Sequence, residues 1–435
     1  MNICIVGGGI GGLTAAYELS KAGHRVFVYE KEQSIGGLVD TVAVNRETVE
    51  KFYHHIFTTD SEIIALVEEL GLKDVLRWYL PRNAIFINNK LYPFTSPVDL
   101  LMFRELAVPE RIKMGLTVLK AARLRDWKAL EEISAKEWIV NNAGKNVYEK
   151  VFKPLLYSKF GADAENISAV WIWNKFKLRG TTRGKNLNRE MLGYMDGSFK
   201  RILDTLVERI TQNGGQVFTD TCVTEIVSTP DNRLCITAGG EKCVFDRVVV
   251  TAAPAVLGDI APELPESYVK RLSGIKYKAN ICVMLEMSDR LSPWYWITVA
   301  GEDFPFVLAI EHTNLVQDGR YNGSILYLSR YLDPEDEMYR LLDDSVTKIF
   351  VKGLKRIFPD MDESIIKNIH VNRALYAQPV VTGNYPAVLP DFCTPVKNLY
   401  IASMAQIYPE DRGQNYAVLI GKKVAKAIEP GGIGS

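Results

Sequence analysis

Three glycines near the first residue have the spacing of a phosphate-binding turn. Gly7, Gly9 and Gly12 form a G-x-G-x-x-G pattern, and the acidic residue Glu30 follows further along. Gly7 permits a tight turn, Gly9 lets a pyrophosphate approach the main chain, and Gly12 lets a helix lie close to a strand. A carboxylate at Glu30 can bind a ribose hydroxyl and would repel a 2′-phosphate. The pattern predicts a site for a nucleotide diphosphate.

The elements needed to position these residues are predicted around them. Residues 2–6 are typical of a short apolar strand, a helix begins near Leu13, and Gly23 ends it before a second strand at 25–29. The N-terminus of this helix would face the phosphates with unpaired N–H groups and the positive end of its dipole. The alternative is an ordinary glycine-rich turn, which the complete strand–helix–strand arrangement disfavours.

The composition indicates a large globular protein without a bulk charge. Its 435 residues, 47% of them apolar, exceed what one hydrophobic core usually reaches, so we expect two domains. Lys plus Arg equals Asp plus Glu, at 52 each, which favours neither nucleic acid nor an anionic membrane as a partner. We therefore expect a small-molecule substrate, while nothing in the sequence predicts an oligomeric state.

The cysteines and the N-terminus point to a reducing compartment. The six cysteines have no C-x-x-C pair, metal spacing or disulfide framework, so we expect no metal site and buried thiols. The predicted first strand starts at residue 2, which leaves no room for a secretory signal, and we expect a cytoplasmic protein. The cysteines are Cys4, Cys222, Cys235, Cys243, Cys282 and Cys393.

No apolar stretch approaches the roughly 20 residues needed to cross a bilayer. Residues 100–119 could instead lie on a membrane surface. Charged residues interrupt this stretch, so we prefer a packed helix pair to a peripheral membrane contact. The interrupting residues are Arg104, Glu105, Glu110, Arg111 and Lys113.

Signals of a nucleotide-binding domain recur along the chain, which predicts a discontinuous domain. A helix near 197–213 is followed by strand patterns at 216–219, 223–227, 233–237 and 247–251, and a last strand and helix lie near 398–402 and 414–428. We assign residues 1–75, 190–262 and 368–430 to the nucleotide-binding domain, 76–189 and 263–367 to a substrate domain, and 431–435 to a flexible tail.

Nearly the whole chain resembles the superfamily of FAD-dependent amine oxidases and protoporphyrinogen oxidases, to which UDP-galactopyranose mutases are structurally related. The resemblance rests on the glycine motif with Glu30-Lys31, on Ile35-Gly36-Gly37-Leu38, and on three later segments. These segments are 193–197 with the strand containing Val223, Thr251-Ala252-Ala253-Pro254, and 399–404 with 411–417. The resemblance implies an α/β protein with a discontinuous, doubly wound, glutathione-reductase-like FAD-binding domain and a second, mixed sheet-plus-helix substrate domain.

The resemblance also implies FAD rather than NAD as the cofactor. Val223 would lie beside the adenine, Gly36 and Gly37 near the pyrophosphate and the ring, and Asn415 and Tyr416 at the N1 and O2 edge of the flavin. Negative charge develops at that edge on reduction, and a helix N-terminus with Arg412 nearby would stabilise it. The predicted FAD-binding residues are Gly7, Gly9, Gly11, Gly12, Glu30, Lys31, Gly36, Gly37, Leu38, His55, Val223, Ala252, Ser403, Met404, Arg412, Gly413, Asn415 and Tyr416.

A second resemblance is local. Residues 52–60 are similar to the His-Ile-Phe segment that runs along the flavin face in UDP-galactopyranose mutases, and His55 is the residue carried over. Tyr53 and His54 precede it in place of a glycine-proline turn, and Thr58 replaces a second histidine. The flavin segment near the C-terminus of the mutases is also missing.

His55, Arg412 and Tyr416 are the predicted catalytic residues. A neutral imidazole beside the flavin could take a proton or orient a substrate hydroxyl. The alternative is that one of His54 and His55 packs in the core while the other faces solvent. Arg412 could neutralise the reduced flavin or a substrate carboxylate, or it could pair on the surface with Asp411 or Glu410.

Four residues are predicted to contact the substrate: Arg179, Arg330, Glu311 and Tyr327. Arginine forks bind carboxylates and phosphates bidentately, which also makes Arg183 and Arg189 candidates. Trp294, Tyr295, Trp296, Tyr331 and Tyr376 could line an apolar pocket, although aromatic residues more often pack in a core.

We predict an FAD-dependent oxidoreductase that transfers a hydride from a small-molecule substrate to flavin N5. No second G-x-G-x-x-G is present for a pyridine nucleotide, so oxygen or another external acceptor is preferred for reoxidation. The alternatives are a non-redox isomerase of nucleotide sugars, similar to the mutases, and a non-enzymatic nucleotide-binding protein.

Overall fold

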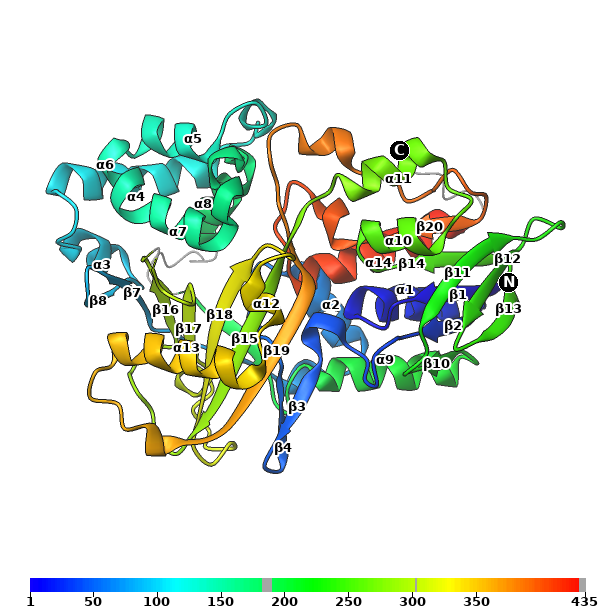
Figure 1. The fold of residues 1–435 in the computed structure, drawn as a ribbon, viewed down its shortest axis with the longest axis horizontal. Coiled ribbons are helices and arrows are strands. Elements are labelled where there is room, and N and C mark those ends of the chain that lie inside the picture. The colour runs from blue at the N-terminus through cyan, green and yellow to red at the C-terminus, as the bar shows by residue number, and fades with distance from the viewer. Residues whose placement is uncertain (182–189, 302, 430–435) are drawn as a thin grey trace.

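A five-stranded parallel sheet forms one side of the molecule (Figure 1). The computed structural model describes residues 1–181, 190–301 and 303–429. The strand order is β10-β2-β1-β14-β20, which confirms the predicted doubly wound arrangement. The strands are β1 (Asn2–Val6), β2 (Arg25–Tyr29), β10 (Gln216–Phe218), β14 (Arg247–Val250) and β20 (Leu399–Ile401).

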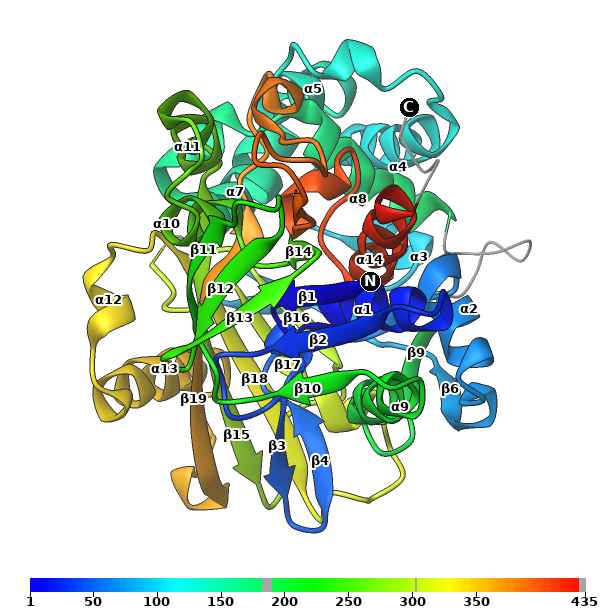
Figure 2. The same ribbon diagram turned by 90° about the vertical axis from the view of Figure 1, so that its right-hand side faces the viewer.

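The two faces of this sheet are covered differently, and alternate residues of β1 serve them. Ile3 and Ile5 pack with helices, whereas Cys4 and Val6 pack toward a three-stranded sheet, because successive side chains of a strand point to opposite faces. Figure 2 shows the covering elements. The helices are α1 (Ile10–Lys21), α9 (Lys200–Gln212) and α14 (Gln414–Ile428), with α2 (Ser61–Glu69) beside α14; the covering strands are β11 (Val223–Ser228), β12 (Leu234–Ala238) and β13 (Glu241–Phe245).

A seven-stranded mixed sheet forms the other side of the molecule, in the order β19-β15-β18-β17-β16-β7-β8. Helices α12 (Glu337–Arg340) and α13 (Asp343–Ile357) lie along it, and apolar residues of α13 cover one face (Figure 1). The strands are β7 (Asn83–Ile87), β8 (Lys90–Pro93), β15 (Tyr277–Met287), β16 (Trp296–Val299), β17 (Leu308–Glu311), β18 (Ser324–Leu332) and β19 (Ile366–Pro379).

A group of helices with its own apolar core lies above this sheet, at the upper left of Figure 1. It comprises α3 (Pro97–Met102), α4 (Val108–Arg123), α5 (Ala135–Asn142), α6 (Lys145–Val147), α7 (Lys153–Phe160) and α8 (Ala169–Thr181), with a π-helical turn at Tyr148–Phe152. Helices α10 (Pro254–Ile260) and α11 (Glu266–Ser273) instead pack beside the parallel sheet. The remaining strands are β3 (Thr41–Val44), β4 (Glu47–Glu50), β5 (Ile56–Phe57), β6 (Leu76–Tyr79) and β9 (Leu192–Met195).

Helices α3 and α4 pack on each other, as preferred from the sequence, but much of their apolar surface stays exposed. Across the described residues, no helix is both long and apolar enough to span a bilayer. The exposed apolar residues of this pair are Val98, Leu101, Met102, Val108, Ile112, Leu116 and Leu119.

Two of the predicted domain boundaries differ from the pairing of the elements. Strand β19 pairs with β15 in the mixed sheet, and α11 packs with the core of the parallel sheet. We therefore propose to move the boundary at 368 to the end of β19 and the boundary at 262 to the end of α11. The predicted tail at 431–435 lies outside the described residues.

The expectation of buried thiols was wrong for four of the six cysteines. Cys4 and Cys282 are buried, but Cys222 and Cys393 are exposed and Cys235 and Cys243 half-buried. Cys235 alternates on β12 with the buried Leu234 and Ile236 and so faces away from the core, whereas Cys243 on β13 packs at the edge of that core. All six are free.

Candidate functional site

The glycine-rich turn before α1 leaves open space at one position. A Cβ on Gly9 would have only the carbonyl oxygen of Gly36 within 4 Å, at 3.9 Å. A Cβ on Gly12 would instead overlap the carbonyl oxygen of Gly7, and one on Gly7 would lie 2.6 Å from Thr251 Oγ1. The absence of a side chain at Gly7 and Gly12 therefore lets the strand and helix pack closely, while the space beside Gly9 is available to a ligand.

Glu30 is held at the edge of this turn. Its carboxylate accepts hydrogen bonds from the N–H groups of Gly8, at 2.7 Å, and Glu32, at 3.0 Å. The Gly36 N–H donates to the carbonyl of Gly8 at 2.9 Å, so residues 36–37 lie over the turn. Lys31 is not brought into this site, because its side chain is 69% exposed and pairs with Glu32.

The first and the last long helices meet here. A Cβ on Gly421 of α14 would overlap the carbonyl oxygen of Gly11 in α1, and one on Gly11 would lie 3.1 Å from the carbonyl oxygen of Ala417. In the described structure, neither helix has a side-chain cap or an acidic residue in its first turn. Both positive helix ends are thus available to a negatively charged group.

Two buried polar side chains near the start of α14 lack partners. Both amide atoms of Gln414 and the hydroxyl of Ser403 have no hydrogen bond among the described residues. Buried polar groups are normally paired, so these atoms fit a bound polar ligand. Together with the open space at Gly9, they are consistent with a dinucleotide that reaches from one helix to the other.

The side chain of Asn415 is engaged by the backbone of another helix. Its Oδ1 accepts hydrogen bonds from the N–H groups of Glu62, at 2.8 Å, and Ile63, at 3.2 Å, in the first turn of α2. Asn415 thus caps α2 from the other end of the chain, and its main chain lies in the first turn of α14. The side chain of Tyr416 donates to Glu410 at 3.0 Å.

His54 and His55 are both half-buried, so the alternative in which one packs in the core and the other faces solvent does not hold. His55 Nδ1 lies 3.1 Å from the hydroxyl of Tyr295, and His54 Nδ1 lies 2.8 Å from the carbonyl of Phe52. Burial lowers the pKa of His54 to about 4 and that of His55 to about 3. Both imidazoles are therefore neutral at physiological pH.

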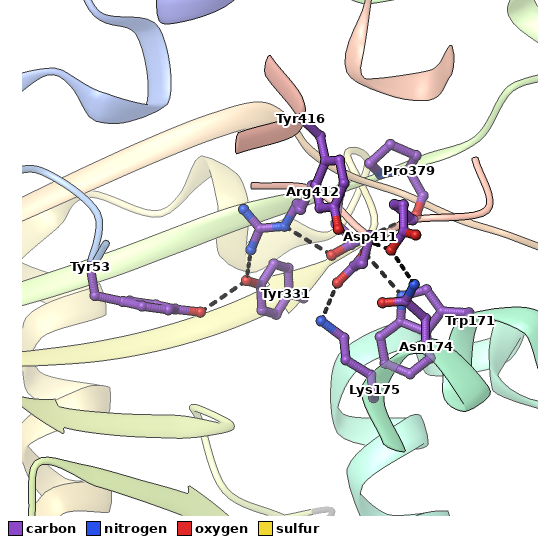
Figure 3. Close-up of polar contacts among 11 residues, drawn as sticks. Tyr53, Trp171, Asn174, Lys175, Tyr331, Pro379, Asp411, Arg412 and Tyr416 are labelled. Atoms are coloured by element: carbon purple, nitrogen blue, oxygen red, sulfur yellow. Dashed lines mark hydrogen bonds and ion pairs between the residues drawn. The ribbon is translucent and has the colours of Figure 1, made fainter. Parts of the chain in front are cut away.

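Arg412 lies in a polar chain that links three parts of the fold (Figure 3). Its guanidinium contacts the hydroxyl of Tyr331 on β18 and donates to Gln378 Oε1 on β19 at 2.9 Å. The Tyr331 hydroxyl lies 3.0 Å from that of Tyr53, next to His54. Arg412 thus points toward the histidine segment and not into a surface ion pair.

The carboxylates beside Arg412 have other partners. Asp411 pairs with Lys175 on α8 and accepts hydrogen bonds from Trp171 Nε1, at 3.1 Å, and Gln378 Nε2, at 3.0 Å (Figure 3). Burial opposes the ionisation of Asp411, but Lys175 and Lys159 outweigh it and hold its pKa well below the usual range. Asp411 is therefore a buried anion.

Of the predicted substrate residues, Glu311 and Arg330 lie away from this site, whereas the Tyr327 ring centroid lies 6.4 Å from that of Tyr53. Glu311 is buried among Ser324 Oγ and the N–H groups of Leu291 and Ser292, which it accepts from. Tyr327 donates its hydroxyl to the carbonyl of Glu50 at 2.7 Å. Both have structural partners.

Arg330 donates to the carbonyl of Phe304 at 3.0 Å, on the face of β18 whose leucines pack toward α13. Tyr331, next in the strand, faces the opposite way. The side chain of Arg179 and the residues Arg183 and Arg189 lie outside the described part of the structure.

Two residues of the site were missed from the sequence. Gln414 was part of a resemblance but received no role. Lys159, on α7, lies with its Nζ 4.7 Å from the ring centroid of Trp171 and 5.0 Å from that of Tyr331. A lysine in an amphipathic helix is typical of a solvated surface, so no local signal marks it.

Comparisons with known proteins agree with this architecture. A 15-cis-phytoene desaturase from Synechococcus elongatus is 22% identical, over 98% of this chain and 96% of that protein. The solved structure of a proposed protoporphyrinogen oxidase from an Exiguobacterium species has a TM-score of 0.79 at 18% identity, covering 98% of each chain. A reduced UDP-galactopyranose mutase has a TM-score of 0.76 at 13% identity, covering 98% of this chain and 95% of the other.

Residues 10–428 match the sequence pattern of the family described as flavin containing amine oxidoreductase. The match takes in both helices that meet at the site. The protein therefore belongs to the flavin containing amine oxidoreductase family and is an oxidoreductase whose cofactor is FAD.

Proposed function

We propose that the chain holds FAD extended from the turn before α1 to the first turn of α14, and oxidises a small molecule by hydride transfer to flavin N5. One observation carries this proposal. Gly11, in the first turn of α1, packs against Ala417 and Gly421 in the first two turns of α14, so two uncapped helices from opposite ends of the chain meet near their N-termini. The amide of Gln414, at the start of α14, has no partner among the described residues. The first helix end favours a pyrophosphate, and the second favours negative charge on a reduced ring.

The residues proposed to hold FAD come from several segments. Glu30 binds a ribose hydroxyl and Val223 contacts the adenine. When bound, FAD supplies a ring that accepts a hydride from a substrate carbon. The remaining FAD-binding residues are Gly7, Gly9, Gly11, Gly12, Gly36, Gly37, Leu38, Ala252, Ser403, Met404, Arg412, Gly413 and Gln414, with the main chain of Asn415 and Tyr416.

His55 is proposed to orient the substrate through Nε2, which has no hydrogen bond among the described residues. Its Nδ1 is engaged with the hydroxyl of Tyr295. A pKa of about 3 makes His55 a weak base at neutral pH. Its imidazolium form, which would act as a general acid, is not populated there. Arg412 is proposed to keep its positive charge near the reacting ring. Tyr416 is proposed to support it by holding Glu410.

The test is anaerobic reduction of the FAD-loaded protein by candidate alcohols, amines and carboxylates, followed by flavin absorbance. Bleaching near 450 nm with one equivalent of oxidised product supports hydride transfer. Oxygen and an artificial quinone then compete to reoxidise the enzyme, which identifies the class of acceptor. Product that forms only when the flavin is reduced beforehand, with no net transfer of electrons to or from the substrate, contradicts hydride transfer.

A second candidate is a non-redox isomerase of nucleotide sugars. The fold similarity to the reduced mutase and the position of His55 beside Tyr295 and Trp296 favour it. Incubation with UDP-galactopyranose under dithionite tests this candidate. An isomer formed only by the reduced enzyme, without net electron transfer, would support it over the oxidoreductase reaction.

A further inference from the structure

Lys159 on α7 is half-buried, and its amine lies among three aromatic rings. Among the described residues, its Nζ has neither a hydrogen bond nor an ion pair and lies between the rings of Trp171, Tyr331 and Phe160. Burial lowers the pKa of its amine well below the usual range; Asp411 opposes this effect, whereas Lys175 and Arg412 add to it. The three rings and Asp411 compensate the burial of this amine only in part, so an anionic ligand that pairs with it would be favoured.

The charges around Lys159 are predominantly positive. Lys159 and Arg412 lie against the same Tyr331 ring, at 5.0 Å and 5.3 Å from its centroid. Asp411 is the carboxylate that acts on this group, and it is already engaged by Lys175, Trp171 and Gln378. Glu410, the next carboxylate, is bound by Asn174, Lys177 and Tyr416. An ammonium ligand would be repelled here, while an anion would be attracted.

The surroundings of Lys159 adjoin the proposed reaction site. Arg412 precedes α14, and its contact with Tyr331 connects Lys159 to Tyr53 and the histidine segment. We propose that Lys159 and Arg412 bind a carboxylate or phosphate group of the substrate, so that the enzyme acts on anions and excludes amines. This inference rests on the proposed function, because it names the substrate class of the same site.

Titration of the FAD-loaded protein tests this inference with four aromatic compounds of similar size: benzoate, phenyl phosphate, benzyl alcohol and benzylamine. The flavin absorbance reports binding. We expect saturable changes with benzoate or phenyl phosphate and none with benzylamine, and the stronger of the two anions distinguishes a carboxylate from a phosphate site. Lys159→Met should weaken anion binding roughly 10- to 100-fold, as expected for a hydrogen bond to a charged group.

Lys153→Met is the matched control, since Lys153 lies on the same helix and pairs with Glu149 at the surface. It should leave anion binding unchanged. If Lys159→Met fails to retain FAD, Lys159→Gln replaces it, and Lys159→Arg should keep the affinity. Equal anion binding by the wild type and the uncharged variant, or binding of benzylamine alone, would overturn the inference.

The two proposals fail in different ways. Flavin bleaching by a neutral or cationic compound, without any anion binding, refutes the anion site and leaves hydride transfer intact. Anion binding that depends on Lys159, in an enzyme that no substrate class bleaches, supports the anion site and refutes hydride transfer.

Discussion

At the scale of single residues, the glycine motif divides its work between packing and ligand space. Gly7 and Gly12 have no room for a side chain because the protein itself fills the space, whereas Gly9 faces an opening. The sequence motif predicts this division of roles, and the structure adds the distances that separate the three positions. Gly9 therefore gives a direct test of ligand binding.

Gly9→Val should abolish FAD binding while leaving the fold in place. Gly9 has φ −69° and ψ 168°, which a β-branched residue can adopt, and its Cβ meets no protein atom closer than 3.9 Å. The added methyl groups would occupy the ligand space. FAD content and the melting temperature of the apoprotein measure the two effects. Gly115→Ala, at an ordinary contact distance in α4, is the control and should retain FAD.

His312 makes the protein sensitive to acid. It is 3% exposed, and burial lowers its pKa to about 3, with Arg320 adding to the effect and Asp318 opposing it. The unfolded chain has a histidine pKa near 6.5, so it binds more protons than the folded chain between these values. The stability contributed by neutral His312 is complete above pH 6.5 and is lost as the pH falls toward 3.

His312→Gln should therefore flatten this pH dependence. Between pH 6.5 and 4, the free energy of unfolding of the wild type should fall by up to about 3 kcal/mol more than that of the variant. Urea unfolding across this range measures the slopes. The difference at pH 7.5 reports the lost ring packing with Tyr194, Tyr321 and Tyr327 and the lost contact with the Tyr321 hydroxyl. Parallel slopes for both proteins would show that His312 does not take up a proton on unfolding.

At the scale of elements, short-range patterns were reliable and long-range partners were not. The strands and helices of the glycine motif, α9 and α14 were predictable because their apolar spacing and turn residues are local. The start of α2 at Ser61 follows from its local apolar spacing, but its cap could not be predicted, because it comes from Asn415 at the other end of the chain. The assignment of Arg330 to the substrate was wrong for a different reason. Because side chains two apart in a strand share a face, Arg330 lies on the same face of β18 as Leu328 and Leu332, which pack toward α13.

Removing the side chain of Asn415 should destabilise α2 without abolishing the cofactor site. Asn415→Ala loses the acceptor for two helix N–H groups, which typically costs about 1 to 2 kcal/mol. Thermal unfolding of the FAD-loaded protein measures the loss, and FAD content is expected to persist. Asn415→Asp keeps the acceptor and adds a favourable charge at the start of α2, so it should remain near wild-type stability. An alanine variant of unchanged stability would show that water replaces the cap.

At the scale of the whole molecule, the active site depends on contacts between the ends of the chain. The sequence predicted that the opening turn and the closing helix share one cofactor, but it could not identify Lys159, whose neighbours come from α8, β18 and the segment before α14. Each of those neighbours is ordinary in its local sequence. Only the three-dimensional arrangement places them together.

The contact between α1 and α14 should therefore be sensitive to added side-chain volume. A Cβ on Gly421 would overlap the backbone of Gly11, whereas a Cβ on Gly11 would lie 3.1 Å from the carbonyl oxygen of Ala417. Backbone atoms cannot move aside as a flexible side chain can, so the two helices must separate. Overpacking of this kind costs about 1 to 3 kcal/mol or more.

Three alanine substitutions should consequently form a graded series in both stability and FAD affinity, with Gly421→Ala most affected, Gly11→Ala intermediate and Gly115→Ala nearest to wild type. Urea unfolding of the apoproteins measures the first quantity, and FAD titration followed by fluorescence quenching measures the second. If helix separation is the cause, the two losses should rise together across the series. A Gly421→Ala protein that is destabilised but binds FAD as tightly as the wild type would show that the site does not need the two helices in contact.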